Sequence, residues 1–254
     1  GETHGDVGIS GMVHYRQTNG FDGIVESDSQ TIVDNSLSSL GFPNVSQAPG
    51  KVHDGRQEFD LNLKVAYKDF YVEGLYINKN VEPFIGPQYA LNNESDVENN
   101  YVFGEAGYKK TFEERFTLKP RIYYDQFDRN IYTESLPEGA TVSSDNDGDG
   151  IADTYYTYPD GHIANSKVIE RVLGTEVPFD YELFDGNTLT LGLEYRYIKQ
   201  TNVHFLSNVD PVTLEPLDSV QDFSESYPQI DTATRSIWSV YLQDTWDITD
   251  ALNF

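Results

Sequence analysis

The chain has 254 residues, a formal net charge of −25 and no cysteine. The acidic balance disfavours nucleic acid as a partner, because phosphate binding requires clustered Lys and Arg, and the lack of cysteine excludes disulfides and thiolate metal sites. No run of 18 or more apolar residues occurs, which excludes a helical membrane protein. A membrane β-barrel stays compatible with this composition, because only every second residue of its strands faces lipid.

Alternation of apolar and polar side chains predicts an all-β chain. In residues 58–68 one face carries Phe59, Leu61, Leu63, Val65 and Tyr67, while the other is mostly charged or amide. The same pattern predicts about eight strands. In chain order they cover residues 7–17, 58–68, 70–79, 101–112, 116–125, 168–183, 188–197 and 235–248. Several of these strands are longer than the strands of soluble proteins usually are. A length of about ten residues is what a tilted strand needs to cross a membrane.

The connections between these strands alternate between short and long. The tight turns are Lys68-Asp69, Glu113-Glu114-Arg115, Phe184-Asp185-Gly186 and the Thr249-Asp250 region. Between them lie long polar segments at about 19–56, 81–100, 130–165 and 203–232. Outer-membrane barrels have short periplasmic turns at one rim and long extracellular loops at the other. The alternation therefore predicts which side of a membrane each connection occupies.

Charged and aromatic residues follow the same division. Segments 130–165 and 203–232 are acidic and contain no Lys or Arg, whereas basic residues such as Lys64, Arg121 and Arg196 lie on polar strand faces, as does Lys119. Aromatic residues gather near strand ends, as in Phe70-Tyr71, Tyr123-Tyr124, Phe179 with Tyr181, and Trp238 with Trp246. They predict two aromatic girdles at membrane interfaces, although aromatic residues are also common in strands generally.

One acidic residue lies on a face predicted to be apolar. Asp244 shares its side of the last long strand with Trp238, Leu242 and Trp246. A lipid-facing Asp is costly at mid-membrane depth and tolerated near the interface, so we expect Asp244 to lie close to the short turn.

Two stretches resemble the barrels of TonB-dependent outer-membrane receptors. Leu173 to Tyr197, LGTEVPFDYELFDGNTLTLGLEYRY, is similar to their hairpins, and Ser236 to Phe254, SIWSVYLQDTWDITDALNF, is similar to the family's "YxQDxW-ITDxLxF" hairpin. The resemblance implies an antiparallel, up-and-down transmembrane β-barrel, of which residues 1–254 form a partial wall of about eight long strands. Because the family has an N-terminal plug domain and a 22-strand barrel, we expect this chain to be a barrel fragment lacking the plug and the C-terminal strands.

The same resemblance implies a function and a location. We expect a receptor in the outer membrane of a Gram-negative bacterium, taking up a scarce ligand such as an iron-siderophore or a cobalamin. The implied partners are outer-membrane lipid, a small-molecule metal chelate, and the TonB complex acting through a plug. Segments 81–100, 130–165 and 203–232 are the candidates for ligand contact, because function concentrates on loops carried by a rigid scaffold.

One loop contains a candidate metal site. Asp145, Asp147, Asp149 and Asp153 place carboxylates at nearly every second position around Gly148 and Gly150, as hard cations require. The pattern resembles Asp-rich calcium loops but is not a full EF-hand, because Tyr156 stands where a bidentate Glu is expected. One interpretation of this loop is a calcium site, and the other is a solvated acidic loop tip. No other cofactor is predicted.

No catalytic constellation is recognisable, and we expect the protein not to be an enzyme. The five histidines, at positions 4, 14, 53, 162 and 204, show neither HxH nor HExxH spacing, so structural roles are expected. A nucleophile elbow and a phosphate-binding glycine motif are both missing.

Two alternatives to a receptor wall stay open. The first is a small complete barrel acting as an adhesin or structural protein, which requires the first and last strands to pair. The second is a soluble or surface-exposed calcium-binding β-domain, in which the apolar faces pack into a core instead of meeting lipid.

Overall fold

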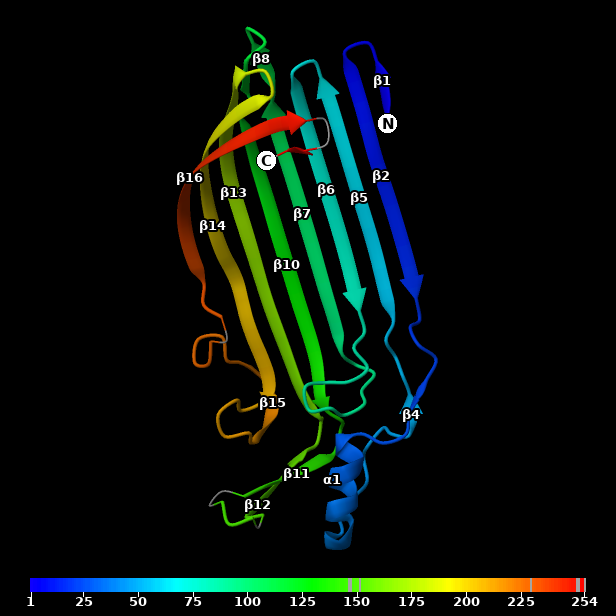
Figure 1. The fold of residues 1–254 in the computed structure, drawn as a ribbon. Helices are drawn as coiled ribbons and strands as arrows, with labels where there is room; N and C mark the ends of the chain where they lie inside the picture. The colour runs from blue at the N-terminus through cyan, green and yellow to red at the C-terminus, as the bar shows by residue number, and fades with distance from the viewer. Residues whose placement is uncertain (146–147, 151, 229, 250–251, 254) are drawn as a thin grey trace.

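The computed structural model describes residues 1–145, 148–150, 152–228, 230–249 and 252–253. In this part of the chain thirteen strands form one antiparallel sheet (Figure 1). Its main path runs β1 (Glu2–His4), β2 (Val7–Thr18), β5 (Arg56–Tyr67), β6 (Phe70–Val81), β7 (Asp96–Tyr108), β10 (Arg121–Leu136), β13 (His162–Phe184), β14 (Asn187–Val209), β16 (Ala233–Thr249) and β17 (Leu252–Asn253). Neighbours along the chain are neighbours in the sheet, which is an up-and-down meander.

Shorter elements branch from this path or lie in the loops. A hairpin of β8 (Lys110–Phe112) and β9 (Phe116–Leu118) extends one turn, and β15 (Pro216–Asp222) pairs with the end of β14. The loops carry two small two-stranded sheets, β3 (Ile24–Val25) with β4 (Gly50–Lys51) and β11 (Ala140–Ser144) with β12 (Thr154–Tyr158). Residues 29–40 form α1 (Ser29–Leu37) and the 3₁₀ turn η1 (Ser38–Leu40). The described helices include none long and apolar enough to cross a membrane.

All eight predicted strands are found, and the structure corrects their extents. The predicted strand 116–125 is divided between β9 and β10 at Lys119-Pro120, where proline cannot donate to the ladder. The segments predicted as long loops at 130–165 and 203–232 are shorter loops than expected, because β10, β13 and β14 continue into them and β11, β12 and β15 form within them. The segment 19–56 likewise contains α1, β3 and β4, and β7 begins inside the predicted loop 81–100.

The two kinds of connection lie at opposite ends of the sheet, as predicted. Tight turns join the strands at the end drawn uppermost in Figure 1, and the loop elements α1, β4, β11, β12 and β15 gather at the other end. The turn at Lys68-Asp69 is closed with Lys68 at φ 53°, and the turn after β13 has Gly186 at φ 81°, a conformation that glycine adopts without strain. Of the predicted turn Thr249-Asp250, Asp250 lies outside the described residues.

The sheet is open in the described residues. β1 pairs only with Val7, Gly8 and Ile9 of β2, and β17 pairs only with Asp247 and Thr249 of β16. Most of the free edge of β2 and most of the free edge of β16 therefore have no strand beside them in the described chain, and the sheet is not closed into a barrel.

The main buried cluster lies at the loop end of the sheet, although Ile169 and Val172 of β13 and Phe205 of β14 are also buried. Leu136, Ala140, Tyr158 and Val209 form a buried cluster where β10, β11, β12 and β14 meet. Along the sheet itself one face is apolar and uncovered: Trp238 is 79%, Val240 72% and Leu242 67% exposed. Within the described residues no second layer packs on this face, which we call the outward face. The opposite face is called the polar face.

The apolar part of the outward face has a sharp limit on its loop side. The last apolar residues before this limit are, from β2 to β16, Tyr15, Phe59, Tyr76, Val102, Tyr124, Leu173, Tyr197 and Trp238. The next outward residues are all polar: Gln17, Gln57, Asn78, Asn100, Gln126, Arg171, Lys199 and Ser236. Strand pairing shows that the limit is staggered. Tyr15 stands opposite Phe59, Tyr76 opposite Val102, and Tyr124 opposite Leu173, but each of these pairs is two residues further from the loops than the one before.

Candidate functional site

The polar face carries a network of ion pairs and tyrosine hydrogen bonds. The Arg121 guanidinium on β10 lies 2.9 Å from the Glu105 carboxylate on β7 and 2.6 Å from Glu176 on β13. Tyr241 on β16 donates its hydroxyl to Glu176 at 2.8 Å. These contacts link β7, β10, β13 and β16 across the sheet, so the charged residues that alternation placed on polar faces stabilise one another there. Lys64 likewise pairs with Glu73 at 2.9 Å, and Lys119 pairs with Asp180.

Tyrosines on this face lie over glycines of the neighbouring strand. Tyr123 covers Gly174 and donates its hydroxyl to Glu194 at 2.8 Å, and Tyr241 covers Gly192 in the same way. A Cβ atom at either glycine would overlap the tyrosine ring. The two glycines therefore allow a long side chain to lie flat across one strand and reach a carboxylate on the next.

We expect Gly174→Ala to lower the free energy of unfolding by about 1–3 kcal/mol, because the added methyl displaces Tyr123 from Glu194 and overpacks the face. Urea unfolding of the purified protein measures the change. Gly104→Ala is the matched control, since its nearest neighbour is the Glu73 carbonyl oxygen at an ordinary 3.9 Å. Equal stability of the two variants would show that the tyrosine contacts contribute little.

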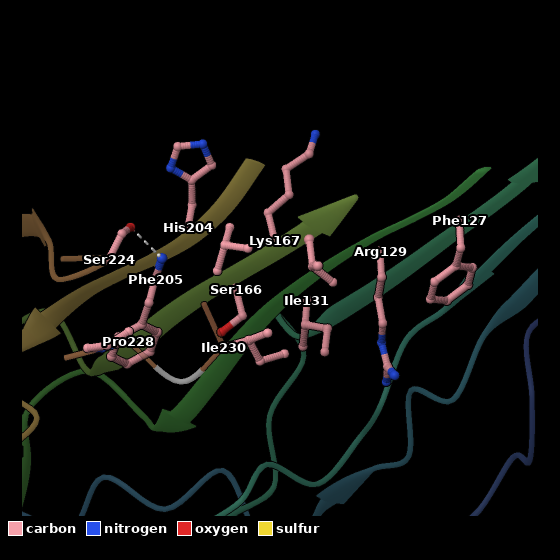
Figure 2. Close-up of a pocket in the computed structure, with 12 residues that line it drawn as sticks. Phe127, Arg129, Ile131, Ser166, Lys167, His204, Phe205, Ser224, Pro228 and Ile230 are labelled. Carbon is pink, nitrogen blue, oxygen red and sulfur yellow. Dashed lines mark hydrogen bonds between the residues drawn. The ribbon is translucent and has the colours of Figure 1, made fainter. Parts of the chain in front are cut away.

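A cavity of about 260 Å³ opens on the polar face at the loop end of β10, β13 and β14 (Figure 2). Its walls are mostly apolar, with Arg129, Ser166, Lys167, His204 and Ser224 as polar residues; the apolar residues are Phe127, Ile131, Val168, Val203, Phe205, Pro228 and Ile230. This volume is at the lower limit for ligand pockets. The cavity fits one apolar or aromatic group of a ligand and not a whole large chelate.

The roof of this cavity comes from the segment after β15. The Phe205 backbone N–H donates to Ser224 Oγ at 3.0 Å, and the Phe223 N–H donates to the Phe205 carbonyl at 2.8 Å. The Phe205 ring also packs against Tyr227, with centroids 6.3 Å apart. Arg129 forms no ion pair with a described residue, although the chain is strongly acidic. Figure 2 shows Arg129 and Ile131 on the cavity side of the strands, with Lys167 and His204 projecting from the other side.

At the loop rim, one buried carboxylate connects two loops. Asp28, the N-cap of α1, accepts hydrogen bonds from the Thr31 N–H and hydroxyl, the Ser46 hydroxyl and the Leu91 N–H, each at 2.7 Å. Burial raises the pKa of Asp28, but these hydrogen bonds outweigh it and hold the pKa below its ordinary value. Asp34, also buried, accepts from the Val45 and Ser46 N–H groups. The first two long loops are therefore a single hydrogen-bonded unit.

Three of the four predicted calcium residues, Asp145, Asp149 and Asp153, lie between β11 and β12. The Asp145 carboxylate accepts from the Gly148 and Gly150 N–H groups, each at 2.7 Å, and the Asp153 N–H donates to the Ser144 carbonyl at 2.8 Å. Asp149 lies between these two glycines, and Asp147 lies outside the described residues. No set of three His, Asp or Glu side chains able to hold a metal ion is found among the described residues. Calcium binding at this loop stays a prediction.

The other singled-out residues have local partners. His14 lies 3.1 Å from Asp60 on the polar face, and the His162 ring stacks on Tyr158, where burial lowers the pKa of His162. Asp244 lies beside the Gly186 turn, as expected, and accepts from Trp246 Nε1 at 2.7 Å and Asn187 Nδ2 at 2.6 Å.

The sequence indicated the loops as ligand candidates but not the cavity. Segment 203–232 supplies Val203, His204, Phe205, Ser224, Pro228 and Ile230 to the cavity and segment 130–165 supplies Ile131, while the other lining residues lie on β10 and β13 outside the segments predicted as candidates. Because these residues come from separate strands, alternation within any one strand could not reveal the cavity. Comparisons with protein-family models, with curated proteins and with solved structures find no match.

Proposed function

We propose that this chain is part of the wall of an outer-membrane β-barrel receptor, of the TonB-dependent kind, that takes up a scarce ligand from outside the cell. The staggered limit of the outward apolar face carries the proposal. A band of lipid is level, whereas strands in a barrel are tilted, so lipid contact ends at a different register position on each strand. A face that packs against a soluble core has no reason to end in a regular stagger.

The size of the stagger agrees with a barrel. From β2 to β16 the limit moves by about six residues over seven strand-to-strand steps, always away from the loops. With about 3.3 Å per residue and about 4.8 Å between strands, this shift corresponds to a strand tilt of about 30°. Membrane barrels are tilted by about 35–45°. Trp238 and Trp246 stand at the two limits of β16, about 26 Å apart along the strand, so the tilted apolar band is about 23 Å tall, against about 25 Å in known barrels.

Aromatic residues mark both limits of this band. On the loop side they include Tyr15, Tyr76, Tyr124 and Tyr197, and on the turn side Tyr67, Phe70, Tyr108 and Tyr181. Several loop-side hydroxyls reach the polar row beyond: Tyr124 donates to Gln126 at 2.8 Å and Tyr15 to Gln17 at 2.8 Å. An apolar ring with a polar tip suits a membrane interface. Of the predicted girdle residues, Tyr71 and Tyr123 lie on the polar face, so that part of the prediction was wrong.

The free edges and the cavity complete the proposal. Unpaired backbone groups cost several kcal/mol each in hydrocarbon, so in a membrane the free edges of β2 and β16 would pair with further strands. The polar face would then line a lumen. The cavity beneath Ile230 lies at the loop end of that lumen and would contact part of an incoming ligand. Its Arg129 forms no ion pair with any residue that the structure describes.

Tryptophan quenching by brominated lipids tests the proposal, because the chain has only two tryptophans. In phosphatidylcholine vesicles, Trp246→Phe and Trp238→Phe each leave one tryptophan at one limit of the band. We expect bromine near the headgroup to quench both more strongly than bromine at mid-chain. Leu242→Trp, made in a chain lacking both natural tryptophans, should show the reverse order, since Leu242 lies midway between them.

Gln243→Trp in the same background is the matched control, because its side chain lies on the polar face beside Leu242. It should be quenched less than Leu242→Trp by the mid-chain bromine. A soluble β-domain would give no depth-dependent quenching at any of these positions, and that result would reject the membrane assignment.

A further inference from the structure

Two cations stand directly opposite each other on the outward face. Arg171 of β13 and Lys199 of β14 are register partners, and both belong to the first polar row beyond the apolar band. Like charges in this relation destabilise a sheet. The chain has 42 acidic residues, so a nearby carboxylate would have been easy to supply.

No described carboxylate neutralises this pair. The Arg171 guanidinium is held by neutral groups, with Nε donating to Gln126 Oε1 at 2.9 Å and an Nη donating to Thr201 Oγ1 at 2.8 Å. Lys199 is exposed and forms no ion pair among the described residues. The arginine is therefore oriented by hydrogen bonds while its charge stays available.

A second pair of basic residues follows on the same face. Lys167, four residues before Arg171 on β13 and about 13 Å closer to the loops, is the register partner of His204. These two have weak acidic neighbours, Asp128 at 3.9 Å and Asp222 at 4.0 Å. Figure 2 shows the side chains of Lys167 and His204 projecting to the side of the strands opposite Arg129 and Ile131, although both residues also border the cavity.

We infer that Arg171 and Lys199, with Lys167 beyond them, bind the phosphate groups of a lipid headgroup in the leaflet next to the long loops. The inference rests on the proposed function, which makes Leu173 and Tyr197 the last lipid-facing residues of their strands. Cations immediately beyond them lie at headgroup depth, where they attract anionic lipid. The Arg171 guanidinium, held by Gln126 and Thr201, matches the geometry of a phosphate group, and the Lys199 ammonium adds a second positive charge. A headgroup with two phosphates can reach both the Arg171–Lys199 pair and Lys167.

The test uses the full chain in zwitterionic detergent, titrated with diphosphorylated lipid A or with dephosphorylated lipid A of the same acyl chains, with bound lipid read by native mass spectrometry. We expect the unmodified protein to prefer the phosphorylated form, and Arg171→Gln/Lys199→Gln to weaken its binding about 30-fold. Binding of the dephosphorylated form should not change. Lys79→Gln, which removes an exposed cation from the polar face, is the matched control and should leave both affinities as they were.

Three results would overturn the inference: equal affinity for the two lipids, an unchanged affinity in the double variant, or displacement of the lipid by excess inorganic phosphate, which would indicate a site for free phosphate instead. These results leave the depth profile of the tryptophans untouched. A failed depth profile would reject the barrel wall itself, so failure of the headgroup site and failure of the proposed function are distinguishable.

Discussion

Leu193→Arg is expected to lower the free energy of unfolding in lipid vesicles by about 2–4 kcal/mol, the cost of an arginine facing lipid at the bilayer midplane. Leu193 lies halfway between Leu189 and Tyr197 on β14, and its side chain is 49% exposed on the outward face. In water an exposed position tolerates a charge, so the penalty arises only if hydrocarbon covers it. Urea unfolding from vesicles, followed by tryptophan emission, measures the difference.

The matched control is Gln57→Arg. Gln57 lies on the same outward face, exposed, one row beyond Phe59 on the loop side of the apolar band. Near the interface the same substitution costs only about 0–1 kcal/mol. The predicted difference therefore depends on depth in the membrane and not on the introduced charge. Comparable losses in the free energy of unfolding for Leu193→Arg and Gln57→Arg would contradict the assignment of the apolar band to lipid.

The strands were predictable wherever their two faces differ. Phe59 to Tyr67 alternate because one face is apolar and the other carries Asp60, Asn62, Lys64 and Ala66. The structure places both neighbouring strands, β2 and β6, in the register that this pattern requires. Beyond the band the alternation disappears. In residues 198–209 of β14 both faces meet polar or loop surroundings, so the ladder continues without a period-two signal, and the prediction ended this strand at Tyr197.

The elements inside the long loops left weaker signals. Asp28 and Thr31 form a capping box at the start of α1, but the helix is only nine residues long and its apolar residues do not form a clear stripe. The cavity was beyond prediction because Ser224, Pro228 and Ile230 line it from a part of the chain far from Phe127 and Arg129 of β10. The cation pair could be predicted only in part. Alternation from Leu173 and Tyr197 places Arg171 and Lys199 on the outward face, but only the strand register shows that the two residues stand opposite each other.

Replacing Asp28 with Asn is expected to loosen the long-loop rim without affecting the sheet. The Asp28 Oδ1 atom accepts from Thr31 and Ser46, and Oδ2 accepts from the Leu91 N–H. An asparagine keeps one acceptor oxygen and turns an NH₂ group toward the other donors. Losing a charged acceptor and leaving a buried donor unsatisfied costs about 2–3 kcal/mol of local stability. Amide hydrogen exchange at Leu91 and Thr31 should therefore accelerate about 30-fold or more at pH 7.

The pH dependence separates this mechanism from a change in packing. Because the pKa of Asp28 is lowered in the folded loops, its stabilisation is fully present above the unfolded value of about 3.9 and is lost as the pH falls through the lower folded value. Protection at Leu91 should then decline below about pH 4 in the unmodified protein and stay flat and low in Asp28→Asn. Asp22→Asn, in the same loop but with an exposed carboxylate 3.5 Å from Lys51, should behave like the unmodified protein at every pH. If the two variants instead exchange alike, the loops are held together by apolar contacts such as those of Leu37 and Leu91, and the carboxylate is incidental.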